Sequence, residues 1–190
     1  TLTASGTLGF TGGILEGDGT LGANALTGGA ITPGQSGPGI LRFSSDLNLS
    51  TNATVILSGT GTIPGTQCDQ LSVTGAVSLA NATLQVTALP AVAGGTTFVL
   101  LVNDGAEAVS GTFNGLPENS LLNVSGQAFR IHYAGGSGND VTLVRDALPS
   151  GPQLTATGGL TNGVWRFSGL GAPSAIYTIQ ATTNFIQWTN

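Results

Sequence analysis

Short alternating strands between glycine-rich corners recur along this chain, and this pattern restricts the folds open to it. Apolar and polar residues alternate in segments such as Leu47–Leu49, Leu71–Val73, Val77–Leu79 and Val141–Leu143. A period of two residues indicates half-buried β-strands, because successive side chains of a strand point to opposite faces. No segment has the spacing and capping residues of a helix. The sequence therefore predicts an all-β fold.

The corners favour a solenoid over a sandwich or barrel. Strand-like units recur about every 8–12 residues, a spacing that all three architectures share. Here the corners are compact, and the residues 6–9 (Gly-Thr-Leu-Gly) are echoed by residues 19–22. Short repeats of this kind bury their apolar face only by stacking on their neighbours. Four of the corners are the glycine pairs Gly12-Gly13, Gly28-Gly29, Gly94-Gly95 and Gly135-Gly136.

The composition excludes several classes of partner. Only 7% of the 190 residues are charged and lysine is absent, against roughly 25% charged residues in an ordinary soluble domain. The net charge is −5 and the four arginines are scattered, so the clustered basic surface of a nucleic-acid-binding protein is absent. No apolar run approaches the ~20 residues of a transmembrane helix. A surface of hydroxyls and amides is expected of an exposed, secreted or cell-surface protein.

The composition changes at a proline-rich segment, which predicts a domain boundary. Residues 146–152 contain two prolines, a glycine and a serine, which favours a linker. We therefore divide the chain into a solenoid at residues 1–145, the linker at 146–152, and a β unit at 153–190 that contains both tryptophans. This last unit is too short for a sandwich of about seven strands, so it is expected to be incomplete.

Several segments together resemble a known family. Ile31–Phe43 (ITPGQSGPGILRF) resembles the ITPG-x-SPG-x-L-x-F stretch of autotransporter-associated β-strand repeat proteins, with Gly37 inserted. Cys68–Gly75 is similar to their Y-D-Q-L-x-V-x-G strand, and Gly111–Glu118 and Tyr133–Leu143 resemble their closing turns. The resemblance covers roughly residues 1–145. It implies a right-handed parallel β-helix (β-solenoid) on secreted or surface-anchored bacterial proteins.

The C-terminal segment resembles a different module. Residues 177–190 (YTIQATTNFIQWTN) are similar to the Y-x-I-Q-x-S-T-N-L-x-x-W strand pair of fibronectin-III-like, or Ig-like, modules in exported bacterial proteins. Neither resemblance brings catalytic residues or a cofactor with it. Both imply surface display, adhesion or assembly.

Candidate chemistry in residues 1–145 is sparse. Residues 135–140 (GGSGND) begin like a calcium-binding nonapeptide, which makes Asp140 a weak calcium candidate, but one copy without tandem repeats favours a structural corner. The single cysteine, Cys68, is expected to be a small buried hydrophobe. Alternation places His132 and Arg130 on the solvent face of a strand. The acids Asp46, Asp69, Asp104, Glu107, Glu118 and Asp140 are dispersed, so we expect no catalytic site, no metal and no cofactor.

The functional prediction therefore rests on the C-terminal unit. An incomplete β unit leaves an open strand edge, which pairs readily with another chain. We expect a structural protein, a subunit of a bacterial surface stalk or filament that associates with itself or with other surface proteins. Two alternatives remain: an adhesin or glycan-binding module, and an accessory domain of a polysaccharide-active enzyme. The expected interaction residues are Trp165, Phe167, Tyr177, Ile179, Phe185 and Trp188.

Overall fold

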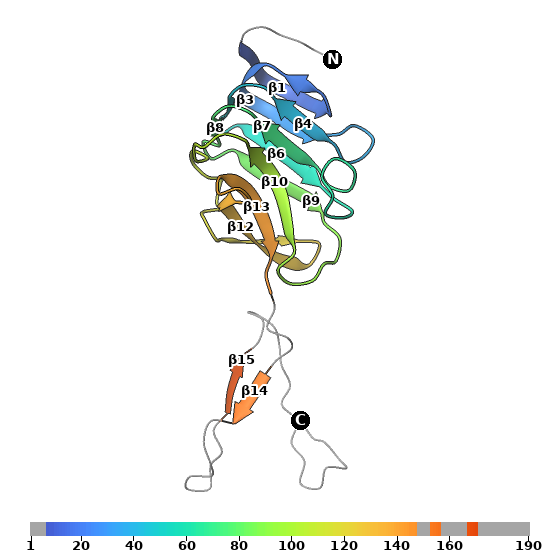
Figure 1. The fold of residues 1–190 in the computed structure, drawn as a ribbon, viewed down its shortest axis with the longest axis vertical. Helices are drawn as coiled ribbons and strands as arrows, with labels where there is room; N and C mark the ends of the chain where they lie inside the picture. The colour runs from blue at the N-terminus through green and yellow to red at the C-terminus, as the bar shows by residue number, and fades with distance from the viewer. Residues whose placement is uncertain (1–6, 148–152, 157–166, 171–190) are drawn as a thin grey trace. The chain divides into compact units, whose positions relative to one another are not determined.

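The structure is a computed structural model that describes residues 7–147, 153–156 and 167–170. All secondary structure in these residues is β, which confirms the predicted all-β class (Figure 1). The chain forms two compact units, Thr1–Asp146 and Ala147–Asn190. The strands of the first unit are β1 (Thr7–Gly17), β2 (Thr20–Leu21), β3 (Ala23–Pro33), β4 (Ile40–Phe43), β5 (Leu47–Leu49), β6 (Ala53–Ser58), β7 (Gln70–Val73), β8 (Val77–Ser78), β9 (Thr83–Ala88), β10 (Thr97–Asn103), β11 (Leu121–Val124), β12 (Gln127–Gly135) and β13 (Asp140–Arg145).

The first unit is built from two sheets between which the chain passes repeatedly. One sheet has the order β8-β5-β3-β6-β9, and β1 pairs with the other edge of β3. The second sheet has the order β11-β12-β13-β10-β7-β4-β2. Every pairing from β1 to β9, and the pairing of β7 with β10, is parallel. Parallel neighbours require crossover connections, and here the intervening strand in the opposite sheet supplies them.

After residue 40 the residues that pair in parallel strands are separated by 29 or 30 positions. Ile40 pairs with Gln70, and Leu71 pairs with Leu101. In the other sheet Leu47 pairs with Val77. Each of these partners lies thirty positions further along the chain, and the carboxylate of Asp46 accepts a bond from the backbone N–H of Ala76 over the same separation, at 2.9 Å. One circuit of the two sheets therefore takes about thirty residues here.

The core lies between the two sheets and follows the alternation of the sequence. In β6 every second residue is buried, and β4 and β5 alternate in the same way. Burying such a side chain contributes roughly 1.5–3 kcal/mol relative to exposing it. The largest fully buried side chains are Phe43, Phe98, Phe129, Ile31, Leu47, Leu71, Leu79, Leu101, Ile131, Leu143, Val55 and Val73.

The parallel winding ends after β10, a feature that the sequence pattern did not predict. Strands β10, β13, β12 and β11 pair in an antiparallel order. Turn chemistry explains the β11–β12 hairpin, because Ser125 and Gly126 between these strands both have positive φ, at 50° and 75°. Two successive residues in this region form the tight turn that suits a two-residue hairpin. The antiparallel strands occupy one end of the first unit, and β1 lies at the other (Figure 1).

The second unit is described by one strand pair. β14 (Gln153–Ala156) runs antiparallel to β15 (Phe167–Leu170), with Gln153 opposite Leu170. Among the described residues, these strands pair only with each other.

Candidate functional site

The GGSGND corner is held together by the carboxylate of Asp140. Asp140 is 5% exposed. One carboxylate oxygen accepts the backbone N–H of Asn103 at 2.9 Å, and the other accepts the backbone N–H and hydroxyl of Ser137 at 2.9 and 3.1 Å. A Cβ on Gly136, whose φ is +55°, would collide with the Asp140 carboxylate. Among the described residues no three His, Cys, Asp or Glu side chains group to hold a metal, and the calcium prediction stays a prediction.

A pocket of about 560 Å³ with a mixed polar and apolar lining lies beside this corner. Its walls are residues 102–106, at the end of β10, and residues 137–139 of the corner. The hydroxyl of Ser137 donates to Oδ1 of Asn139 at 2.8 Å, and Nδ2 of Asn139 donates to the carbonyls of Gly105 and Glu107. Oδ1 of Asn103 is buried without a hydrogen-bond partner. The pocket is lined by Asp104 together with amides and a hydroxyl, and those of Asn139 and Ser137 are bonded within the fold.

A smaller cavity of about 180 Å³ lies between the carboxylates of Glu16 and Asp69. Asp69 is 4% exposed. It accepts the backbone N–H of Gly39 at 3.0 Å and the backbone N–H and hydroxyl of Ser58 at 2.8 and 2.9 Å. Glu16 accepts a bond from Gln35 at 3.3 Å. Because Asp69 accepts bonds from Gly39, just before β4, and from Ser58, at the end of β6, it holds these two segments together.

The region between β10 and β11 is fastened to β12 by Glu118 and Tyr133. One oxygen of Glu118 lies 2.7 Å from Nδ1 of His132, and the other accepts the backbone N–H of Tyr133 at 2.7 Å. The Tyr133 hydroxyl donates to the carbonyl of Leu116 at 2.6 Å and accepts the N–H of Phe113 at 3.0 Å. Burial, the largest cause, raises the pKa of Tyr133 to about 12. The hydrogen bond from Phe113 lowers this pKa, and the negative charge of Glu118 raises it. These contacts are structural.

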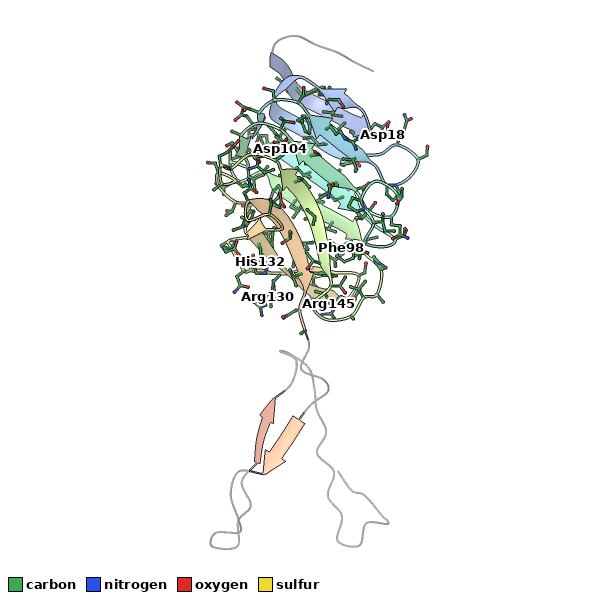
Figure 2. All side chains as sticks on the ribbon, viewed as in Figure 1. Asp18, Phe98, Asp104, Arg130, His132 and Arg145 are labelled. Carbon is green, nitrogen blue, oxygen red and sulfur yellow. The ribbon has the colours of Figure 1, made fainter. Side chains whose placement is uncertain are left out.

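The predicted two faces of β12 are confirmed. Phe129, Ile131 and Tyr133 are buried, whereas Arg130 and His132 are partly exposed on the opposite face. Figure 2 shows Arg130, His132 and Arg145 at the end of the first unit that β12 and β13 form, with Asp18 at the opposite end.

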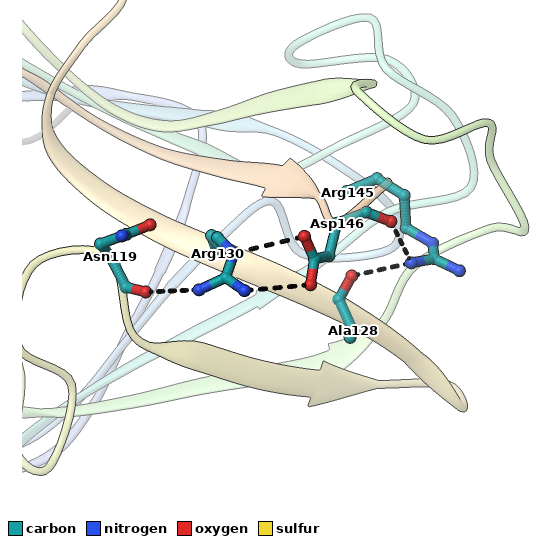
Figure 3. Close-up of polar contacts among 5 residues, drawn as sticks. All are labelled: Asn119, Ala128, Arg130, Arg145 and Asp146. Atoms are coloured by element: carbon teal, nitrogen blue, oxygen red, sulfur yellow. Dashed lines mark hydrogen bonds and ion pairs between the residues drawn. The ribbon is translucent and has the colours of Figure 1, made fainter. Parts of the chain in front are cut away.

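Two arginines bind the last residues of the first unit. Nε of Arg130 lies 3.2 Å from the Asp146 carboxylate, and its Nη1 donates to the carbonyl of Asn119 at 3.1 Å (Figure 3). Nη1 of Arg145 donates to the carbonyls of Ala128 and Asp146 at 3.0 and 2.7 Å. Arg145 also stacks over the ring of Phe129, 5.9 Å from its centre. Both guanidinium groups are therefore occupied by the fold itself.

The single cysteine is buried, as the sequence predicted. Cys68 is 3% exposed and forms no disulfide. Burial raises the pKa of its thiol, and the charge of the neighbouring Asp69 raises it further. A thiol with a raised pKa is a poor nucleophile at neutral pH, so Cys68 acts as part of the core.

The outer edge of β1 is the most exposed strand surface of the first unit. Among the described residues β1 pairs along one edge, with β3, and Gly17 and Gly34 form one further bridge. Its Ile14 side chain is 66% exposed, the highest value among the large apolar side chains that the structure describes. The sequence did not predict this surface. The echoed segments at residues 6–9 and 19–22 do not pair with each other, because Thr7 pairs with Ala23 and Thr20 pairs with Arg42.

The predicted interaction residues lie in the second unit. Phe167 begins β15 and pairs with Ala156 of β14. The others lie outside the described residues, so their role stays a prediction: Trp165, Tyr177, Ile179, Phe185 and Trp188.

Comparisons of the chain with protein-family models, with curated proteins and with solved structures each found no match. The described residues include no helix that is long and apolar enough to cross a membrane.

Proposed function

We propose that this chain is an extracellular structural protein, a subunit of a bacterial surface stalk or filament. In this proposal the parallel part of the first unit, from β1 to β10, forms a right-handed β-solenoid that serves as a rod, and the antiparallel strands β11–β13 lie at its end. The chain assembles through β-strand contacts of its C-terminal unit with other copies. It carries out no catalysis and needs no cofactor.

The observation that carries the proposal is the parallel register of thirty residues between β4, β7 and β10. A chain that returns to the same lateral position after a fixed number of residues builds length in one direction. Such stacking gives a rigid spacer whose stability is roughly the sum of contacts between neighbouring turns.

The carboxylates of the first unit support a structural role over a hydrolytic one. Glycoside hydrolysis needs a pair of carboxyl groups that face a common substrate. Here Asp69 and Asp140 are buried and bonded to backbone N–H groups, and Glu118 is bonded to His132 and to the backbone of Tyr133. These three acids already serve the fold.

The second unit supports assembly through strand contacts. Its described part is the two-stranded antiparallel sheet β14–β15. Addition of a strand from another chain is an established way to complete such a sheet.

Assembly can be tested by comparing the full chain with a chain that ends at Asp146. We expect the full chain to form fibres or long oligomers in electron microscopy and sedimentation. We expect the shorter chain to remain monomeric with an unchanged β-type circular dichroism spectrum. Normal polymerisation of the shorter chain would contradict assembly through the C-terminal unit.

The pocket beside Asp140 favours a second candidate, a glycan-binding adhesin. Its volume of about 560 Å³ lies within the range of roughly 300–1,000 Å³ typical of ligand sites. Saturable binding of a polysaccharide by a protein that stays monomeric would favour this candidate over the filament subunit.

A further inference from the structure

The tripeptide Thr-Gly-Gly occurs three times in the chain, at residues 11–13, 27–29 and 157–159. The first two copies stack on each other in β1 and β3, with Phe10 beside Leu26 and Ile14 beside Ala30. The second glycine of each copy has the same left-handed conformation, with φ of 84° at Gly13 and 83° at Gly29. The tripeptide therefore forms the same local bulge in two adjacent parallel strands.

The glycines of β3 are required because β1 lies against them. A Cβ on Gly28 would come within 2.6 Å of the Thr11 carbonyl oxygen, and one on Gly29 within 2.5 Å of the Gly13 oxygen. Such distances are shorter than real Cβ contacts. A strand that carries this bulge therefore excludes side chains at both glycine positions of the strand beneath it.

Gly12 is the corresponding first glycine of β1, but no neighbouring strand in the described part of the chain lies close enough to require glycine there. A Cβ at Gly12 would meet nothing within 4 Å, and its φ is not in the left-handed region. Gly12 occupies the position in β1 that Gly28 occupies in β3. Glycine at this position is explained if another strand with the same bulge stacks on the outer edge of β1.

The outer edge of β1 is suited to receive such a strand. Eleven residues long, β1 has a single partner strand, β3, among the described residues. Edge strands that must stay free are commonly protected by lysine or proline, and β1 contains neither. Its one charged residue is Glu16.

We propose that β14 of a second copy, together with the Thr157–Gly159 tripeptide that follows it, adds in parallel to the outer edge of β1. This inference rests on the proposed self-assembly and names its two surfaces. The third Thr-Gly-Gly follows β14 directly, and residues 153–163 carry no charge that Glu16 would repel. Among the described residues β14 pairs along one edge, with β15.

Cross-linking of two full-length variants tests the contact. Aligning the tripeptides places Ile14 beside Leu160, as Ile14 lies beside Ala30 within the chain. Neighbouring strands lie about 4.8 Å apart, which is within the Cα separation of about 4.4–6.8 Å that a disulfide spans. We expect a disulfide-linked dimer when Ile14→Cys and Leu160→Cys proteins, each also carrying Cys68→Ala, are mixed and oxidised. Neither protein alone should give it.

An exposed residue elsewhere on the first unit supplies the control for this cross-link. Ile63 is 56% exposed and belongs to none of the strands. Mixing Ile63→Cys with Leu160→Cys, in the same Cys68→Ala background, should give no dimer. Equal dimer yields from the two mixtures would overturn the inference.

A substitution in β1 tests the contact without engineered cysteines. We expect Gly12→Ala to reduce assembly at least tenfold while leaving the melting temperature of the monomer unchanged, because the added Cβ blocks only an incoming strand. Gly9→Ala is the matched control: its Cβ also meets nothing within 4 Å, and Gly9 pairs with Ala25, which carries a Cβ. This variant should assemble normally.

The outcomes separate this inference from the proposed function. Assembly that is unaffected by Gly12→Ala and gives no Ile14–Leu160 cross-link overturns the β1 contact but leaves filament assembly standing. Absence of assembly in every full-length protein overturns both. A cross-link that forms within one Ile14→Cys, Leu160→Cys chain at high dilution also overturns the contact between copies.

Discussion

At the scale of single residues, buried polar side chains hold the turns of the first unit. Asp69, Asp140 and Tyr133 are each less than a tenth exposed, and each bonds backbone groups of a distant segment. An unpaired buried donor or acceptor costs about 1–3 kcal/mol. These side chains therefore contribute most through the backbone groups that they satisfy.

Tyr133→Phe should destabilise the first unit by about 1–3 kcal/mol, because the Phe113 N–H and Leu116 carbonyl lose their partner. The substitution should also change the alkaline pH dependence. Tyr133 has a folded pKa of about 12 and an unfolded pKa of about 10. The stability that this raised pKa contributes is full below pH 10 and is lost as the pH rises through about 12.

Urea unfolding at several pH values measures both effects. The difference in unfolding free energy between the native protein and Tyr133→Phe should be constant up to about pH 10 and should then narrow, since only the native protein loses the contribution of this hydroxyl. A difference that stays constant to pH 12 would contradict the role assigned to Tyr133.

The sequence predicts the faces of these residues but not their partners. Alternation placed His132 and Arg130 opposite Phe129 and Ile131, and the structure confirms it. It could not pair His132 with Glu118, because that contact depends on the path of the segment between β10 and β11. Likewise the sequence indicates only a turn residue at Asp69. Its bonds to Gly39 and Ser58 depend on the folded path of the chain.

At the scale of the strand, β1 and β3 bring their backbones unusually close together. The strands touch through their Thr-Gly-Gly bulges, where carbonyl oxygens of β1 lie over glycines of β3. The sequence marked Gly12-Gly13 and Gly28-Gly29 as corners. They are instead bulges inside long strands, because a glycine pair signals unusual backbone geometry without saying whether the chain turns there.

Gly28→Ala should destabilise the first unit by about 1–3 kcal/mol, the usual cost of forcing extra volume into a packed position. The clash is with the Thr11 backbone, which cannot rotate away as a side chain could. Guanidinium unfolding of the chain that ends at Asp146 measures the loss of unfolding free energy. Gly12→Ala is the control, because it adds the same methyl group where no atom lies within 4 Å. Equal midpoints for the two variants would be inconsistent with this packing.

At the scale of the whole molecule, the first unit contains its own core and its own terminal contacts. The chain clusters into units that divide after Asp146, and the buried apolar residues described here all precede that point. The backbone of Arg145 bonds to Gly95 and Thr96, and the backbone N–H of Asp146 bonds to Ala128. The last two residues of the unit therefore close its end.

Two truncations test this closure. A chain that ends at Asp146 should unfold in one cooperative transition. A chain that ends at Val144 should be less stable by about 1–3 kcal/mol, mainly from lost hydrogen bonds, since the partly exposed Arg130–Asp146 ion pair adds little. Differential scanning calorimetry compares them, and coincident transitions would show that Arg145 and Asp146 are dispensable for the fold.

The sequence predicted the class and much of the strand content of this molecule. It did not predict that β11–β13 are antiparallel, because alternation within a strand is the same in either pairing direction. The signal lay in the turns, where Ser125-Gly126 joins β11 to β12 with two positive φ values. An Asn-Gly or Asp-Gly pair would have predicted a two-residue hairpin, whereas Ser-Gly predicts a turn without specifying its type.

The thirty-residue register also bears on how such a chain can change in length over evolutionary time. Duplication of one complete circuit, such as residues 40–69, would insert a new layer whose inward and outward residues match those above and below. Insertion of a single residue within β7 would instead turn the rest of that strand inside out. Gene duplication in multiples of this unit is therefore the mutational route by which relatives of different length can arise from one another without redesign of the core.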